Sequence, residues 1–373
     1  MYHKYKEAFV KSIDVLESKT DRKYNLKSFA NKICENQSQS HTINLYKLLN
    51  DILNSYSNND EIIKGCKNVK NHLLLYYGAL EISSMIEPFL EQNYSFEDLL
   101  NKLDNLIGLK EVKDNVQDLI AFQKVQIIRR KNGFNSPIQT LHMSFIGNPG
   151  TGKTTVARIV GRIYKHLGLL SKGHFIEVSR TDLISGYQGQ TALKVQEIIK
   201  RAKGGVLFID EAYSITENEN TDSYGRECLT ELTKALEDYR EDLVVIVAGY
   251  KVPMINFFKS NPGLKSRFNT FIEFKDFDHH ELFKILQLMC SQNDYKIKDD
   301  AISKIQELIF KTVSNKEENF SNGRFVRNMY NNLILEHAKR VSLINNPNIS
   351  DLQEIELQDV IKNLNPLTKN ITY

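Results

Sequence analysis

The stretch GNPGTGKT, Gly147 to Thr154, constrains the fold of this chain more than any other part of its sequence. It matches the pattern G-x-x-x-x-G-K-[ST] in full. An apolar run, Leu141–Ile146, precedes it, and the following residues, Thr155–His166, are predicted to form a helix. A strand, a glycine-rich loop and a helix in this order predict a loop that binds phosphate groups.

The residue types in this loop suit phosphate binding. Its glycines let backbone N–H groups turn inward around phosphate oxygens, and the following helix directs the positive end of its dipole at the same place. Lys153 can reach the β- and γ-phosphates, and the hydroxyl of Thr154 can ligate Mg²⁺. A chance match in a glycine-rich turn is the alternative. The predicted nucleotide-binding residues of the loop are Asn148, Pro149, Gly150, Thr151, Gly152, Lys153, Thr154 and Thr155.

The segment GGVLFIDEAY, Gly204 to Tyr213, is an apolar strand that ends in two adjacent carboxylates. Asp210 is expected to hold Mg²⁺ directly or through a coordinated water, and Glu211 to be the general base that deprotonates an attacking water. A solvated acidic turn at a strand end is the alternative. With the phosphate loop upstream, the two carboxylates predict an enzyme that hydrolyses ATP with the help of Mg²⁺.

Three zones of the chain differ in their apolar patterns. Residues 1–98 have helical periodicity, including an apolar stretch at Leu73–Leu90, and are expected to form an all-α domain. In residues 99–275, short runs rich in Val, Ile and Phe alternate with helical stretches, which predicts an α/β domain with a parallel sheet buried on both faces. Residues 276–373 are expected to form a small helical domain. The helices predicted there are His279–Asn293, Asp300–Val313, Arg324–Asn345 and Asp351–Leu364.

Composition and charge argue against several classes of function. The net charge of +3 gives no strong electrostatic footprint for nucleic acid or anionic lipid. No apolar run approaches the length of a membrane-spanning helix, and the N-terminus lacks the apolar core of a signal peptide. The four cysteines form no CxxC pair, so reduced thiols are expected rather than a zinc site. These features favour a cytoplasmic protein without a membrane partner.

The motifs together resemble those of an AAA+ ATPase, and more narrowly those of the CbxX/CfqX group. Besides the phosphate loop and the acidic strand, the resemblance lies in LDNLIGLKEVKDNV (Leu103–Val116), YGRECLTELTKALEDYREDLVVIVAGYK (Tyr224–Lys251), NPGLKSRF (Asn261–Phe268) and NGRFVRN (Asn322–Asn328). It implies an AAA+ P-loop NTPase sheet domain over residues 99–275 and a helical lid domain over residues 276–373. Residues 1–98 lie outside the resemblance and are expected to bind a partner.

The resemblance also implies roles for single residues. The segment that usually packs on adenine is matched by Leu106, Ile107 and Gly108. Arg267 matches the arginine finger, which completes the ATP site of a neighbouring subunit and stabilises charge on the γ-phosphate. Without the family, Arg267 would be an ordinary surface cation. Arg324 matches the sensor-2 arginine of the lid domain, and Arg327, one turn later, is the competing candidate.

The strand after the acidic motif ends in VAGYK, Val247 to Lys251, where many AAA+ proteins carry a polar sensor-1 residue. The nearest position is Tyr250, and the AGY form is typical of the CbxX/CfqX group. The phenol of Tyr250 either orients water or packs against its neighbours. The sequence leaves both roles open.

The stretch SGYQGQT, Ser185 to Thr191, places an aromatic ring between two glycines. In AAA+ rings this connection points into the central pore, so the resemblance implies a pore loop that grips a polypeptide through apolar contact. The residues of this loop would be Tyr187, Gln188 and Gly189. In the alternative, Tyr187 packs against its own domain.

These features predict an ATPase that couples hydrolysis in a ring, expected to be a homohexamer, to remodelling or partial threading of a client protein. One alternative is an ATP-dependent switch or scaffold that recruits a partner through the N-terminal helices. The other is a DNA-acting AAA+ loader, for which the basic cluster Arg129-Arg130-Lys131 and the near-neutral net charge give little support. The sequence does not identify the client.

Overall fold

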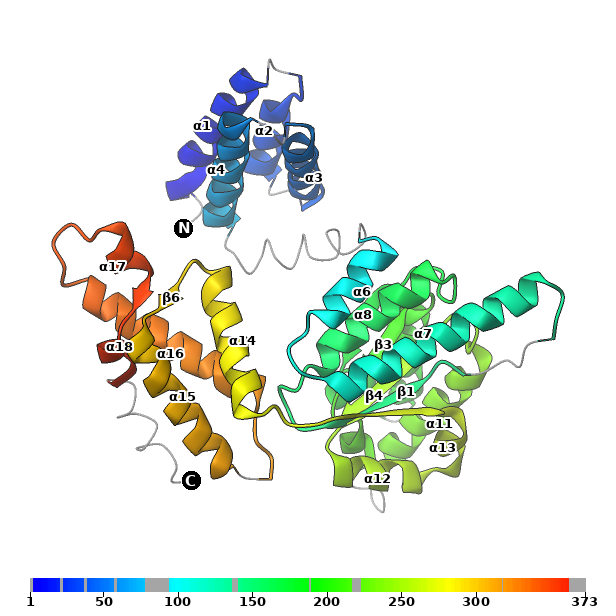
Figure 1. Cartoon of the computed structure of the whole chain (residues 1–373). Helices are drawn as coiled ribbons and strands as arrows, with labels where there is room; N and C mark the ends of the chain where they lie inside the picture. The colour runs from blue at the N-terminus through cyan, green and yellow to red at the C-terminus, as the bar shows by residue number, and fades with distance from the viewer. Residues whose placement is uncertain are drawn as a thin grey trace. The chain divides into compact units, whose positions relative to one another are not determined.

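The computed structural model describes residues 3–20, 23–36, 39–56, 59–77, 94–135, 140–187, 189–216, 223–316 and 318–361. The chain divides into two compact units, Met1–Ser95 and Phe96–Tyr373, and each is described by itself. Figure 1 shows the elements of both units. None of the helices within the described ranges is long and apolar enough to span a membrane.

The N-terminal unit is a bundle of α1 (His3–Lys19), α2 (Leu26–Asn36), α3 (Gln39–Ser55) and α4 (Asp60–Tyr77). Apolar side chains recur at helical spacing along one face, and Phe9, Ile13 and Leu16 of α1 are fully buried. Phe9 stacks on Tyr76 of α4, with ring centroids 5.8 Å apart. The unit therefore has a hydrophobic core of its own. Of the predicted helix Leu73–Leu90, α4 covers the beginning, and the remainder lies outside the described residues.

The second unit contains a five-stranded parallel sheet, which confirms the predicted α/β fold. The strands are β1 (Met143–Gly147), β2 (Phe175–Val178), β3 (Val206–Ile209), β4 (Val244–Gly249) and β5 (Thr270–Phe274), in the order β2-β3-β4-β1-β5. Every residue of β3 and β4 is buried, which means that both faces of the sheet are covered there. Continuous apolar runs such as VLFI suit strands in this environment.

Helices connect and cover these strands (Figure 1). They are α6 (Phe96–Asp104), α7 (Lys110–Lys131), α8 (Lys153–His166), α9 (Arg180–Leu183), α10 (Gln190–Ala202), the 3₁₀ helix η2 (Ala212–Thr216), α11 (Ser223–Asp238), α12 (Lys251–Ser260) and α13 (Pro262–Arg267). One apolar cluster joins α10, α11 and α12 to the sheet. Since all strands run parallel, the carboxyl ends of β1 and β3 meet at one edge of the sheet. That edge brings the phosphate loop and the acidic pair together.

The lid consists of α14 (His279–Gln292), β6 (Lys296–Ile297), α15 (Asp299–Ser314), α16 (Gly323–Val341), α17 (Ile349–Gln353), β7 (Glu354–Ile355) and α18 (Leu357–Ile361). The prediction of one continuous helix over Asp351–Leu364 was wrong. The chain leaves the helix after Gln353, and β7 pairs in parallel with β6. Ile355 is fully buried in the lid core in this arrangement, so burial of its side chain outweighs the local helical pattern.

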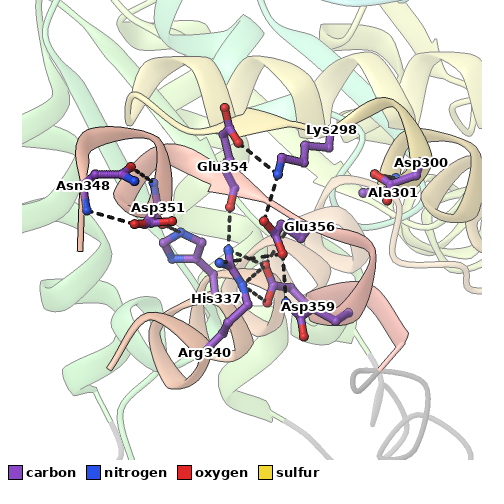
Figure 2. A network of polar contacts seen from close by, with 11 residues as sticks. Lys298, Asp300, Ala301, His337, Arg340, Asn348, Asp351, Glu354, Glu356 and Asp359 are labelled. Carbon is purple, nitrogen blue, oxygen red and sulfur yellow. Dashed lines mark hydrogen bonds and ion pairs between the residues drawn. The ribbon is translucent and has the colours of Figure 1, made fainter. Parts of the chain in front are cut away.

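A buried ion pair joins the last elements of the lid to α16 (Figure 2). The Nε of Arg340 donates to Oδ1 of Asp359 at 2.9 Å, and its Nη2 donates to Oδ2 at 3.1 Å. The side chain of Asp359 is 1% exposed and that of Arg340 is 10% exposed. Arg340 also donates to the carbonyl of Glu354, and Asp359 accepts from the N–H of Glu356. The pair therefore ties β7 and α18 to α16.

We expect Asp359→Ala to lower the stability of the lid, because it leaves the Arg340 guanidinium buried without its carboxylate. Breaking such a pair from one side costs about 3–5 kcal/mol, which should lower the midpoint of urea unfolding followed by circular dichroism. Lys311→Ala is the matched control, since it breaks an exposed pair with Glu307 in the same lid. It should leave the midpoint almost unchanged. Equal midpoints for the two variants would contradict a stabilising role for Asp359.

Candidate active site

The phosphate loop connects the end of β1 to the first residue of α8, Lys153. Its glycines adopt left-handed backbone conformations, with φ of 72° at Gly150 and 93° at Gly152. Gly150 also lies against the lid: a Cβ there would be 2.3 Å from the carbonyl oxygen of Ser321 and 2.8 Å from the nitrogen of Arg324. The loop can therefore keep this shape and this contact only with glycine at position 150.

The side chain of Lys153 lies across the loop and is 9% exposed. Its Nζ donates to the carbonyl oxygens of Gly147 and Asn148, at 2.8 Å each. Burial lowers the pKa of Lys153 to about 8, while Asp210 and Glu211 raise it and Arg324 lowers it further. An anionic group bound at the loop would raise this pKa again, since opposite charge favours the protonated form of the amine.

The acidic pair follows directly after β3. Glu211 has a φ of 48°, a left-handed conformation that is uncommon outside glycine, and its N–H donates to Oδ1 of Asp210 at 3.0 Å. This turn directs the chain from the buried strand into η2. Asp210 is half-buried and Glu211 is exposed. Strained backbone of this kind persists only where the surrounding fold holds it in place. It is found most often at functional sites.

A pocket of about 590 Å³ joins these groups. Of the predicted site residues it is lined by Leu106, Ile107, Pro149, Gly150, Gly152, Lys153, Thr154, Thr155, Asp210, Glu211, Tyr250, Arg324 and Arg327. The sheet domain supplies the phosphate-loop side of the pocket, and α14 and α16 supply the opposite side. The hydroxyl of Thr154 and the carboxylate of Asp210 are oxygen donors of the type that Mg²⁺ prefers, so the residues present fit this ion.

Three of the predicted nucleotide-binding residues do not line the pocket. Their local contacts instead fix the backbone next to it. Gly108 turns the chain between α6 and α7 with φ of 65°, where a Cβ would meet Oε1 of Glu281. Thr151 is buried, and its hydroxyl donates to the carbonyl of Asn148 at 2.8 Å. The amide of Asn148 donates to Asp276 at 2.9 Å and to the carbonyl of Glu318 at 3.0 Å.

The lid adds apolar wall residues that the sequence reasoning did not identify. They are Phe277, Ile285, Leu288 and Met289, beside Leu109 from the sheet domain. The spacing of Ile285, Leu288 and Met289 on α14 is what any amphipathic helix shows, so it indicates core packing as readily as a ligand wall. The apolar side chains suit a flat heterocycle, while the charged residues lie at the phosphate loop.

Arg324 and Arg327 both line the pocket from the first turns of α16, and both are exposed. Arg324 lies close enough to Lys153 for its charge to lower the pKa of that amine. Tyr250 caps the start of α12, and its ring lies 6.0 Å from that of Tyr213, between centroids. Its phenol is therefore at the pocket wall and also within an aromatic contact.

Arg267 ends α13 and does not line this pocket. Its Nη1 donates to the carbonyl of Gly263 at 3.0 Å, and its Nε is 3.6 Å from Oε2 of Glu237. The side chain is 26% exposed. These local contacts hold Arg267 at the surface of the sheet domain.

Tyr187 stands on a loop with an ordered stem. Tyr187 is 72% exposed. The alternative, in which it packs against its own domain, would require it to be largely buried. The N–H of Ser185 donates to Oγ1 of the buried Thr191 at 3.1 Å, and Nζ of Lys194 donates to the carbonyl of Ile184 at 3.1 Å. Gly189 has φ of 77°. Gln188, the third predicted residue of this loop, lies outside the described residues.

Most of the second unit matches models of known protein families. Residues 143–276 match the model described as "ATPase family associated with various cellular activities (AAA)", and residues 278–370 match the AAA lid domain. The chain is similar in fold to the AAA domain of FIGL-1 in complex with ADP, with a TM-score of 0.50 at 18% identity over 70% of this chain and 82% of that one.

Curated relatives are similar over most of their own length. Stage V sporulation protein K of Bacillus subtilis is 36% identical over 314 residues, which are 82% of this chain and 95% of that protein. Protein CbbX of Cereibacter sphaeroides is 43% identical over 66% of this chain and 79% of that protein. A chloroplastic ribulose bisphosphate carboxylase/oxygenase activase of Cyanidioschyzon merolae is 43% identical over 69% of this chain and 83% of that protein.

These matches cover both the sheet domain and the lid, and they agree with the pocket that the phosphate loop and the acidic pair form. The chain therefore belongs to the AAA ATPase family, among the relatives of stage V sporulation protein K and the CbxX and CbbX proteins, and is an ATP-hydrolysing enzyme.

Proposed function

We propose that this ATPase assembles into a ring, most simply a homohexamer, and uses ATP hydrolysis to remodel a client protein through loops that carry Tyr187. One contact supports the coupling above all. The Nη1 of Arg180, in α9 at the base of the Tyr187 loop, donates to the carbonyl of Ser214 in η2, which directly follows Glu211. A change at the hydrolytic carboxylate therefore has a short covalent and hydrogen-bonded route to the loop.

The pocket residues divide the chemistry of hydrolysis among them. Backbone N–H groups of the phosphate loop and the amine of Lys153 bind the phosphate oxygens, and Arg324 approaches the same groups from the lid. Mg²⁺ held by Thr154 and Asp210 would neutralise charge that develops on the phosphates. Glu211 is positioned by its left-handed turn to accept a proton from the attacking water.

Arg267 serves the ATP site of a neighbouring subunit in this proposal. It lies outside its own pocket, on the surface of α13, and a planar, always charged guanidinium suits a γ-phosphate that accumulates charge in the transition state. The site is then complete only in the ring, which makes hydrolysis depend on assembly.

The client is proposed to be a protein. Two relatives are named as activases of ribulose bisphosphate carboxylase/oxygenase, so similar chains act on another enzyme. The N-terminal unit has its own core and is a candidate for client recognition, which also supports the second candidate function, a switch that recruits a partner. Cys34, Cys66, Cys228 and Cys290 form no disulfide bonds, which agrees with a reducing compartment such as the cytoplasm.

We expect Glu211→Gln to lower the rate of phosphate release roughly 100-fold or more while ATP binding is retained, because the variant keeps the shape of the site but lacks the base. Phosphate release and the binding of a fluorescent ATP analogue measure the two effects. Glu241→Gln, an exposed position before β4, is the control and should keep full turnover. Undiminished hydrolysis in Glu211→Gln would remove that residue from its proposed role.

Mixing two inactive variants tests whether Arg267 acts on a neighbouring subunit. Arg267→Ala and Glu211→Gln should each be inactive alone, but a mixed ring contains sites that combine an intact Glu211 with an intact Arg267. Random mixing at equal amounts should restore about a quarter of the sites, because each site takes one residue from each of two subunits. Lys265→Ala, on the same helix, should hydrolyse ATP normally. Mixed rings that stay inactive would contradict action between subunits.

The exposed ring of Tyr187 should be needed for the client and not for basal hydrolysis. Fluorescein-labelled casein serves as an unfolded polypeptide probe. We expect casein to stimulate hydrolysis by the natural chain and by Tyr187→Phe, and to have no effect on Tyr187→Ala, whose basal rate is unchanged. Leu193→Ala removes another exposed apolar side chain, 66% exposed on neighbouring α10, and should still respond. A normal casein response in Tyr187→Ala would contradict the pore-loop role.

A further inference from the structure

Asn322 stands at the start of α16 but does not cap that helix with its side chain. It is fully buried, and its backbone has φ of 45° and ψ of −117°, a combination that only glycine adopts easily. Asn348 shows the contrast within the same lid, since its side chain accepts from the N–H of Asp351 and caps α17 (Figure 2). The side chain of Asn322 must therefore have another use.

The amide of Asn322 contacts three separate segments. Its Oδ1 accepts from the N–H of Phe277 at 2.9 Å, and its Nδ2 donates to Oδ1 of Asp276 at 2.8 Å and to the carbonyl of Phe320 at 2.9 Å. A longer contact of 3.4 Å reaches the carbonyl of Pro149 in the phosphate loop. One buried side chain thus joins the phosphate loop, the segment after β5 and the turn before α16.

Asp276 extends this network back to the phosphate loop. Its Oδ1 also accepts from Nδ2 of Asn148 at 2.9 Å, and its Oδ2 accepts from Nζ of Lys316 at 2.7 Å. Burial alone would raise the pKa of Asp276, but the hydrogen bonds from Lys316, Asn322 and Asn148 lower it overall. The carboxylate is therefore charged at neutral pH and keeps all three donors in place.

The position of Arg324 depends on the Asn322 network, because among the described residues only main-chain hydrogen bonds fix this part of α16. The N–H of Gly323 donates to the carbonyl of Gly150 at 3.0 Å, and the N–H of Arg324 donates to the carbonyl of Ser321 at 2.9 Å. The guanidinium lines the pocket, and within the described part of the chain it makes no hydrogen bond or ion pair. Its place relative to the phosphate loop is thus set by the backbone at Asn322.

A folding role alone does not explain the residue at position 322. Glycine would adopt the observed backbone conformation without strain, and the chain uses glycine at the very next position. What the strained asparagine adds is its side-chain contacts to Asp276, Phe277, Phe320 and the phosphate loop. Strain that the surrounding structure has to hold is characteristic of functional positions.

We propose that Asn322, with Asp276, is a positioning residue that fixes Arg324 against the phosphate loop for ATP hydrolysis. This inference rests on the proposed contact between Arg324 and the phosphates. The inference goes further by assigning the geometry of that contact to the buried amide of Asn322, which does not line the pocket.

The first experiment compares Asn322→Gly with Asn348→Gly in the full-length chain. Asn322→Gly relieves the backbone strain, so its thermal unfolding midpoint should stay within a few degrees of the natural chain, while kcat falls roughly 10- to 100-fold because a small misplacement of a catalytic group is costly. The KM for ATP should change little. Asn348→Gly loses a helix cap but should keep kcat. Asp276→Asn, which retains an acceptor oxygen but loses the charge, should lower kcat less than Asn322→Gly.

The second experiment combines Arg324→Ala with Asn322→Gly. If Asn322 acts through Arg324, the double variant hydrolyses ATP no more slowly than Arg324→Ala alone. Losses that multiply would overturn the inference, and so would full activity in Asn322→Gly beside an impaired Arg324→Ala. Full activity in Arg324→Ala is a separate result: it would remove the proposed contact of Arg324 with the phosphates, and the positioning role with it.

Discussion

The hydrogen bond from the N–H of Gly323 to the carbonyl of Gly150 is the contact on which the geometry of the site depends. Both partners are main chain, and there is no room for a side chain on either side: a Cβ on Gly323 would lie 2.8 Å from the oxygen of Gly150. This close contact therefore fixes the distance between the phosphate loop and the first turn of α16. Arg324 and Arg327 line the pocket because α16 begins at this point.

The electrostatics of the pocket suit a polyphosphate. Lys153 is largely removed from water, and burial lowers the pKa of its amine to about 8 even with Asp210 and Glu211 nearby. A buried cation of this kind gains much from an anionic ligand, since the ligand restores the charge interactions that burial removed. The carboxylates in turn keep the pocket from being uniformly positive, which leaves oxygen donors for a divalent cation.

Along one edge of the parallel sheet lie the Glu211 turn and the segment that leads to the Tyr187 loop. The turn at Glu211 follows β3, and η2 then carries the carbonyl of Ser214 to the guanidinium of Arg180, below the Tyr187 loop. The chemistry and the exposed ring are thus linked through a few residues of the same domain. The contact is a physical connection between two elements, of the kind that can carry coupling between hydrolysis and loop movement.

The sequence by itself determined the α/β fold and the residues at the edge of the sheet that carries the phosphate loop. The glycine, lysine and carboxylate positions follow from chemistry that local spacing reveals, and the buried strands follow from continuous apolar runs. Only the tertiary structure decided how the lid completes the pocket. Ile285, Leu288 and Met289 resemble ordinary core positions until α14 is placed, and Asn322 resembles a helix cap until its amide is seen to contact Asp276. The reason is physical: these roles depend on contacts between segments far apart in the chain, and local periodicity carries no information about such contacts.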